Sequence, residues 1–192
     1  MDKGGRKNGV NFALTTMNWP PDVALALNYA DAGMAALMRF DRTLASTVAA
    51  ARDPVMAQLR LAWWRTQLDA PVTGNEGFEA IQLFGAKLLP IIDGWERLLD
   101  PLPLSEDALT AYCEGRGTIF ALLGGDARMG AAWALGDFAR HCSDVATRDM
   151  ARSLSDRLRR HSARQPKPLR ILTRLARAKN ITRWTLLRAA LS

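Results

Sequence analysis

Residues 53–68, DPVMAQLRLAWWRTQL, constrain the fold more than any other stretch, because they define a helix both at its start and along its length. Asp53 is a good N-cap, since its carboxylate accepts hydrogen bonds from free N–H groups of the first turn, and Pro54 suits the first helical position. Apolar residues follow at helical spacing, which predicts an amphipathic helix. The expected buried face contains Val55, Leu59, Ala62 and Trp63. Of the adjacent Trp63 and Trp64, we expect one to anchor the core and the other to face a cavity or a second layer.

The rest of the chain also favours helices. Ala, Leu, Arg and Met are abundant and runs of β-branched residues are absent, so we expect an all-α fold of roughly eight to nine helices. A length of 192 residues suits a single domain with a sizeable core. We divide it into a disordered leader at 1–19, a helical domain at 20–164 and basic C-terminal helices at 165–192. The chain has no apolar run of about 18 residues, so we expect no membrane span.

Several local signals mark helix ends and close packing. Ser105 and Ser143 are expected N-caps, Gly124 an expected left-handed helix end, and residues 78–89 a single helix. Gly115 and Gly117 flank Arg116 inside a predicted helix, although glycine costs a helix about 1 kcal/mol relative to alanine. Such a pair indicates close approach either of another helix or of a ligand. The two cysteines, Cys113 and Cys142, form no metal pattern; we interpret them as buried thiols of a reducing compartment, with a single disulfide as the alternative.

Positive charge is concentrated at the C-terminal end. Residues 148–192 contain 13 Lys and Arg against two Asp, whereas the whole chain has a net charge of only +7. Two short helices predicted there, 169–178 and 181–191, combine apolar stripes with arginines, a pattern that suits an anionic membrane surface. The alternative is that the stripes pack on the bundle and the arginines form a solvated face. The expected membrane or anion contacts are Arg170, Arg174, Arg177, Arg183 and Trp184.

Five short motifs resemble a known family when they are taken together. They are ALMRFD at 36–41, RLAWWR at 60–65, DGWE at 93–96, YCEGRG at 112–117 and GAAWAL at 130–135. In this order, over about residues 22–145, they resemble the squalene/phytoene synthase family, and RLAWWR is the most specific of them. The similarity is to its short bacterial variety, related to mitochondrial assembly factors for respiratory complex I. It implies a single-domain helical bundle of the isoprenoid (terpenoid) synthase type with a central isoprenoid cavity, here truncated on the C-terminal side.

The resemblance also implies where metal-binding acids should lie. Active members condense two prenyl diphosphates and hold Mg²⁺ with two aspartate-rich motifs, each with carboxylates four residues apart on one helix face. Counting from the matched motifs places these pairs at Ala45 and Ala49, and at His141 and Val145. A shift of one residue at the second motif brings in Asp144 but no carboxylate pair. We therefore expect no Mg²⁺ cofactor and no prenyl transfer.

No residue is assigned a catalytic or metal-binding role with this pattern. Asp137 and His141 are four residues apart, which more often means a salt bridge or hydrogen bond than a metal site. The family positions expected to line the cavity are Phe40, Asp41, Ala45, Ala49, Arg60, Trp63, Trp64, Arg65, Tyr112, Gly117, Trp133, Asp137, Arg140 and His141.

Three hypotheses about function follow. The first is a non-catalytic protein with an apolar cavity for an isoprenoid or lipid, located in the cytoplasm and peripherally on the inner membrane. By the resemblance, it would assist assembly of a respiratory complex, so its partners would be an anionic membrane surface or a protein complex. The second is an active or altered prenyltransferase that uses Mg²⁺. The third is a basic module for acidic partners; nucleic acid is the less favoured partner, because the tail has no reading motif.

Overall fold

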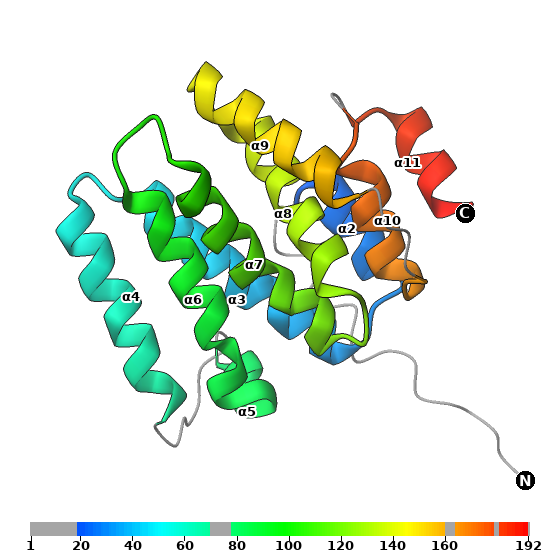
Figure 1. Ribbon diagram of the computed structural model, residues 1–192. Helices are drawn as coiled ribbons and strands as arrows, with labels where there is room; N and C mark the ends of the chain where they lie inside the picture. Colours follow the sequence, from blue (N-terminus) through cyan, green and yellow to red (C-terminus); the bar gives the residue numbers. More distant parts are fainter. Residues whose placement is uncertain (1–18, 70–77, 160–163, 179–180, 192) are drawn as a thin grey trace, which may run out of the picture.

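The chain folds into packed helices (Figure 1). The computed structural model describes residues 19–69, 78–159, 164–178 and 181–191. The described part contains only helices and their connections, as the composition predicted. The elements are α2 (Pro21–Leu27), α3 (Ala32–Ala49), α4 (Pro54–Leu68), α5 (Glu79–Phe84), the 3₁₀ turn η1 (Gly85–Leu88), α6 (Leu89–Glu96), the 3₁₀ turn η2 (Arg97–Leu99), α7 (Glu106–Leu122), α8 (Ala127–His141), α9 (Val145–Leu158), α10 (Lys167–Leu175) and α11 (Arg183–Ala190).

Most predicted helix ends are confirmed. The carboxylate of Asp53 accepts a hydrogen bond from the N–H of Val55 at 2.9 Å, and the Ser105 hydroxyl accepts one from the N–H of Ala108 at 3.1 Å. Gly124 ends α7 with a φ of 73°, in the left-handed region that favours glycine.

Two predicted helix boundaries are wrong. The cap of α9 is Asp144 instead of Ser143, because the Asp144 carboxylate is the group that reaches the N–H of Thr147, at 2.8 Å. The single helix expected at 78–89 is broken at Gly85, where a φ of 53° interrupts α5 and a 3₁₀ turn follows.

Helices α6, α7 and α8 pack together through glycines. A Cβ added at Gly115 of α7 would lie 2.2 Å from the carbonyl oxygen of Pro90 in α6. A Cβ at Gly117, on the other side of α7, would lie 2.6 Å from the carbonyl oxygen of Ala127 in α8. Of the two readings of this glycine pair, the structure shows close approach of helices. Arg116 lies between the two glycines and points into the interior.

Helix α4 buries the opposite face from the one we predicted. Ala57, Leu61 and Trp64 are the buried residues, at the i, i+4 and i+7 positions that contact α3 and α6. Val55 and Trp63 are instead 57% and 48% exposed. The physical reason is that α4 lies at the edge of the bundle and contacts it along a narrow stripe (Figure 1). The remainder of the expected face, Leu59 and Ala62, is exposed as well.

The two C-terminal helices differ in the way their apolar stripes are placed. Helix α10 packs against α2 and α8, and its Leu169, Leu172 and Leu175 are fully buried. In α11, Trp184 is 71% exposed and Leu187 is 49% exposed. The solvated-face alternative therefore applies to the arginines of α10, whereas α11 presents apolar side chains outward.

Other predictions concern the leader, the thiols and the membrane. Except for Trp19, the expected disordered leader at 1–19 lies outside the described residues. Both cysteines are free, Cys113 buried and Cys142 half-buried, and burial raises the pKa of the Cys113 thiol to about 12. None of the described helices has the length and apolar character needed to cross a membrane.

Candidate functional site

A cavity of about 690 Å³ lies between α2, α3, α7 and α8. Helix α3 separates it from α4, because Phe40 faces the α4 side, with its ring edge-on to Trp64 at 5.5 Å, while Asp41 and Ala45 face the cavity. Six of the expected family positions lie on its wall, namely Asp41, Ala45, Ala49, Tyr112, Asp137 and His141. Apolar side chains from Trp19, Val23, Met38 and Phe138 complete much of the lining.

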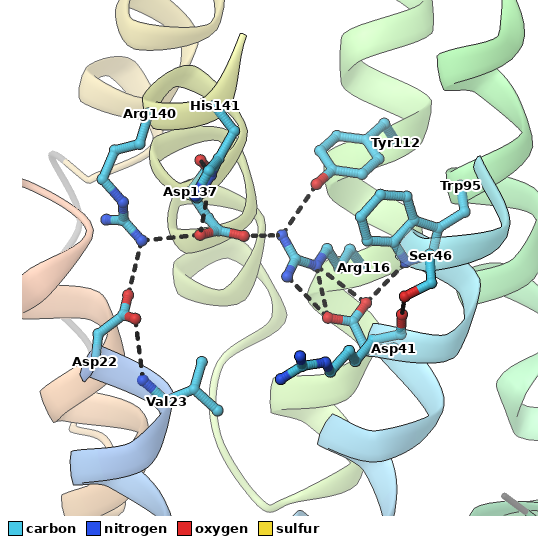
Figure 2. Close-up of polar contacts among 11 residues, drawn as sticks. Asp22, Val23, Asp41, Ser46, Trp95, Tyr112, Arg116, Asp137, Arg140 and His141 are labelled. Atoms are coloured by element: carbon cyan, nitrogen blue, oxygen red, sulfur yellow. Dashed lines mark hydrogen bonds and ion pairs between the residues drawn. The ribbon is translucent and has the colours of Figure 1, made fainter. Parts of the chain in front are cut away.

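Arg116 is the centre of the polar groups on this wall (Figure 2). Its Nε and Nη2 donate to the Asp41 carboxylate at 2.8–3.0 Å, so that this pair is bidentate. Its Nη1 donates to the Tyr112 hydroxyl at 3.0 Å and to Asp137 Oδ2 at 2.7 Å. The guanidinium also lies over the ring of Trp133, 4.2 Å from its centroid. Every nitrogen of Arg116 therefore has a partner inside the protein.

A second arginine continues the chain of ion pairs to α2. Nη2 of Arg140 donates to Asp137 Oδ1 at 2.8 Å and to Asp22 Oδ2 at 2.7 Å. Asp22 is only 1% exposed and also accepts from the N–H of Val23. At the other end of this series of ion pairs, Trp95 Nε1 donates to Asp41 Oδ1 at 2.8 Å. The ion pairs thus link α2, α3, α7 and α8, which are the helices that enclose the cavity (Figure 2).

The mutual contacts of Arg116 and Asp137 keep both of them ionised. Burial acts to lower the pKa of Arg116, but Asp41 and Asp137 outweigh burial and hold that pKa well above its ordinary value. Burial acts to raise the pKa of Asp137, but Arg116 and Arg140 hold it below the usual range. Burial raises the pKa of Tyr112, so its phenol stays neutral and accepts the hydrogen bond from Arg116.

The carboxylates at this cavity are engaged by Arg116 and do not form a pair four residues apart on one helix. Mg²⁺ needs oxygen ligands in near-octahedral geometry, and a motif pair would supply two carboxylates from one helix face. Ala45 and Ala49 have no ligand atom, and Asp41 and Asp137 are already bound by Arg116. His141 Nδ1 lies 3.9 Å from Asp137 Oδ1 and contacts the Asp137 carbonyl at 3.0 Å. Within the described ranges, no cluster of three or more His, Cys, Asp or Glu is placed to hold a metal ion.

The residues of the RLAWWR motif do not reach this cavity. Arg60 and Trp63 are exposed on α4, and Trp64 is in the core beside Phe40. Arg65 forms ion pairs with Asp93 at 2.7 Å and with Glu96, both on α6. Our expectation that these positions line the cavity is corrected here: α4 packs on the far side of α3, so its side chains cannot reach the wall.

Three further expected positions support the wall from behind. Gly117 lies in the α7–α8 contact, and Trp133 is buried, stacked on Phe120 with ring centroids 5.5 Å apart. Arg140 reaches the cavity wall only through the carboxylate of Asp137. None of the three lines the cavity. Trp133 and Arg140 contact Arg116 and Asp137 from outside it, and Gly117 lets α7 approach α8.

Three polar residues of the site were not predicted as site residues from the sequence. Arg116 and Trp95 stood within quoted motifs but were not selected, and Asp22 was not singled out. The signal for Arg116 was its position between two glycines. Each glycine lets another helix pack closely against α7, so the residue between them is buried. Asp22 had no such signal, since its partner Arg140 is 118 residues away.

The expected membrane or anion contacts are mostly on the outside of α10 and α11. Arg170, Arg174 and Arg177 are exposed, and Trp184 is 71% exposed. The side chain of Arg183 lies outside what the structure describes.

Comparisons of the chain with protein-family models, with curated proteins and with solved structures found no match.

Proposed function

We propose that this chain is a non-catalytic, ligand-binding protein of the squalene/phytoene synthase type that acts at an anionic membrane surface. The observation that carries the proposal is the wall of the cavity. Ala45 and Ala49 stand on it where metal-binding acids would be needed, and Asp41 and Asp137 are held by Arg116. The wall therefore favours binding of an apolar ligand such as an isoprenoid or lipid, and it does not favour catalysis of diphosphate release from a prenyl diphosphate.

The exposed face of α11 supports the membrane part of the proposal. Trp184, Leu187 and Leu191 are 71%, 49% and 80% exposed, at spacings that place them on one side of the helix. Arg174, Arg177 and Arg188 line a hollow between α10 and α11 that Leu191 also lines. Exposed apolar side chains beside arginines suit an anionic lipid surface. Assistance in the assembly of a membrane-bound respiratory complex is the biological role that we propose for such a protein.

A ligand-binding experiment tests the cavity. Farnesol, an uncharged isoprenoid, is titrated into the wild-type protein and tryptophan fluorescence is followed, because Trp19 and Trp95 line the cavity. Ala45→Phe places a large side chain in the cavity and is expected to abolish binding. Ala62→Phe, on the exposed face of α4, is the matched control and should bind as the wild type does. Equal binding by both variants would overturn the cavity assignment.

An activity assay tests the absence of catalysis. The purified protein is incubated with farnesyl or geranylgeranyl diphosphate and Mg²⁺, and the products are extracted. We expect no squalene or phytoene. Robust formation of either would sink the proposal and favour the prenyltransferase alternative.

Vesicle flotation tests the membrane surface. We expect the protein to float with vesicles that contain phosphatidylglycerol, and Leu187→Glu to prevent this. Flotation that is unaffected by Leu187→Glu would remove α11 from the proposal.

A further inference from the structure

A second hollow lies on the other side of α8 from the cavity. It has a volume of about 450 Å³ and is bounded by α8, α9 and the end of α10. Ligand sites usually have volumes of about 300–1,000 Å³, so the size suits a small ligand or a head group. Five arginines contribute to its wall, and we call it the arginine hollow: Arg140, Arg148, Arg152, Arg159 and Arg177.

Gly136 brings the parts of the arginine hollow together. A Cβ at Gly136 would lie 2.7 Å from the carbonyl oxygen of Ala176 and 2.9 Å from Nη2 of Arg159. Because Gly136 has no side chain, the end of α10 and the guanidinium of Arg159 both approach α8. The hollow is therefore built by the packing of three helices.

Arg159 is fixed in place without being neutralised. Its guanidinium donates to the carbonyl oxygens of Ala132 at 3.1 Å and Thr173 at 3.0 Å, and to the Ser155 hydroxyl at 3.1 Å. These partners are uncharged, so the positive charge persists. Burial, and then the nearby Arg177, lowers the pKa of Arg159 to about 10. The hollow thus holds a positive charge at an electrostatic cost, which an anion would relieve.

Two other arginines of the hollow have hydrogen-bonding capacity that the described residues leave unused. Nε of Arg148 is buried and makes no hydrogen bond; it forms a long ion pair with Asp149 Oδ1 at 3.8 Å, a carboxylate that also pairs with Arg152 at 3.3 Å. Arg177 is exposed, and no side-chain hydrogen bond or ion pair of Arg177 is found within the described part of the chain. Among the described residues of the wall, Asp156 is the one carboxylate.

We propose that the arginine hollow binds a phosphate group. Arg140 is paired with Asp22 and Asp137, and Arg148 and Arg152 with Asp149, whereas Arg159 and Arg177 form no ion pair among the described residues. Guanidinium groups bind phosphate oxygens through paired N–H donors, so two such arginines on one hollow favour an anion with several oxygens. The phosphate can belong to a free phosphate or diphosphate, or to a phospholipid head group. This inference goes beyond the proposed function, because it needs neither an apolar ligand in the cavity nor a relation to any family.

Calorimetric titration with inorganic pyrophosphate tests the site in solution. We expect binding by the wild type, and a Kd at least about tenfold higher for Arg148→Gln/Arg177→Gln, which removes charged hydrogen bonds to the ligand. Arg60→Gln/Arg128→Gln is the matched control, since it removes the same charge from exposed positions outside the hollow and outside α10 and α11. Arg177→Glu is a further variant: we expect it to lose pyrophosphate binding while its melting temperature stays that of the wild type, which shows that the loss is not caused by unfolding.

Vesicle binding forms the second arm and distinguishes the two sources of phosphate. Pyrophosphate binding that is lost only in the hollow variant supports a soluble ligand. Flotation with phosphatidylglycerol vesicles, without pyrophosphate binding, supports a lipid head group if the hollow variant loses it and the control variant does not. Equal losses in both variants, or no binding of either probe, would overturn the inference. Pyrophosphate binding by a protein that does not float would leave this inference standing and refute only the membrane part of the proposed function.

Discussion

The two sides of α8 use arginine in different ways. On the cavity side, Arg116 and Arg140 are bound by three carboxylates, those of Asp22, Asp41 and Asp137. In the arginine hollow, Arg159 is bound by neutral oxygens and its neighbours are mostly other arginines. Arginine therefore joins helices through carboxylates on the cavity side, whereas in the hollow Arg159 and Arg177 keep a charge that no ion pair among the described residues balances.

The difference has an energetic meaning. A buried ion pair is costly to break, because removal of one partner leaves an uncompensated charge in a poorly solvated place. A cluster of like charges is costly to keep, and removal of one member relieves repulsion. Substitutions on the two sides of α8 should therefore change the free energy of unfolding by different amounts. The changes also differ in sign if the relief of repulsion exceeds the lost contacts.

The largest effect is expected for Arg116→Met. It removes the arginine that pairs with buried Asp41 and leaves Asp137 with Arg140 as its remaining arginine partner, and we expect a loss of about 3–5 kcal/mol in the free energy of unfolding. Urea unfolding measures this. Arg97→Met is the control: Arg97 forms an exposed ion pair with Asp100, so its loss should cost at most about 1 kcal/mol. A cost for Arg116→Met as small as that for Arg97→Met would show that the ion pairs do not hold the helices together.

A smaller effect is expected from acid. The pKa of Asp137 is held below its ordinary value of 3.8 in the folded protein, so the unfolded chain binds its proton first as the pH falls. The stability that Asp137 provides is therefore fully present above about pH 4 and is lost as the pH falls through the folded-state pKa. Unfolding measured from neutral to acid pH should show this decline. Asp137→Asn should flatten it; an unchanged slope would mean that other carboxylates cause the acid sensitivity.

The smallest effect is expected in the arginine hollow. Arg148→Gln/Arg177→Gln removes two charges from a region of like charge, so we expect the free energy of unfolding to change by about 0.5 kcal/mol or less, or to rise slightly. Repetition in high salt sharpens the result, because salt screens exposed charges and should stabilise the wild type more than the variant. A loss of several kcal/mol would place these arginines in the same structural class as Arg116.

Local features of the fold could be predicted from the sequence, and long-range ones could not. The caps at Asp53 and Ser105 depend on neighbouring residues alone, so they were predicted correctly. The buried face of α4 was not, because its sequence contains two apolar stripes and only the position of the helix in the bundle selects between them. Whether the apolar stripes of α10 and α11 pack on the bundle or face outward was left open for the same reason.

The candidate site shows the same limit. Asp41 and Asp137 were selected through the resemblance, and the structure brings both to the cavity wall. Their common partner Arg116 is 75 residues from Asp41, and no periodicity in the sequence relates the two. The arginine hollow was not anticipated either, because its residues come from α8, α9 and α10, and the sequence showed only that the C-terminal quarter is basic.

The glycine contacts of α7 also set limits on motion. With no space for a methyl group toward Pro90 on one side or Ala127 on the other, α7 cannot rotate or slide against α6 and α8 without a clash. These three helices should therefore exchange their amide hydrogens most slowly, and the cavity has one immobile wall. Motion of the cavity wall is therefore expected in α2 and α3, where glycine contacts as close as these are not found among the described residues. The ion pair between Asp22 and Arg140 limits the motion of α2 relative to α8.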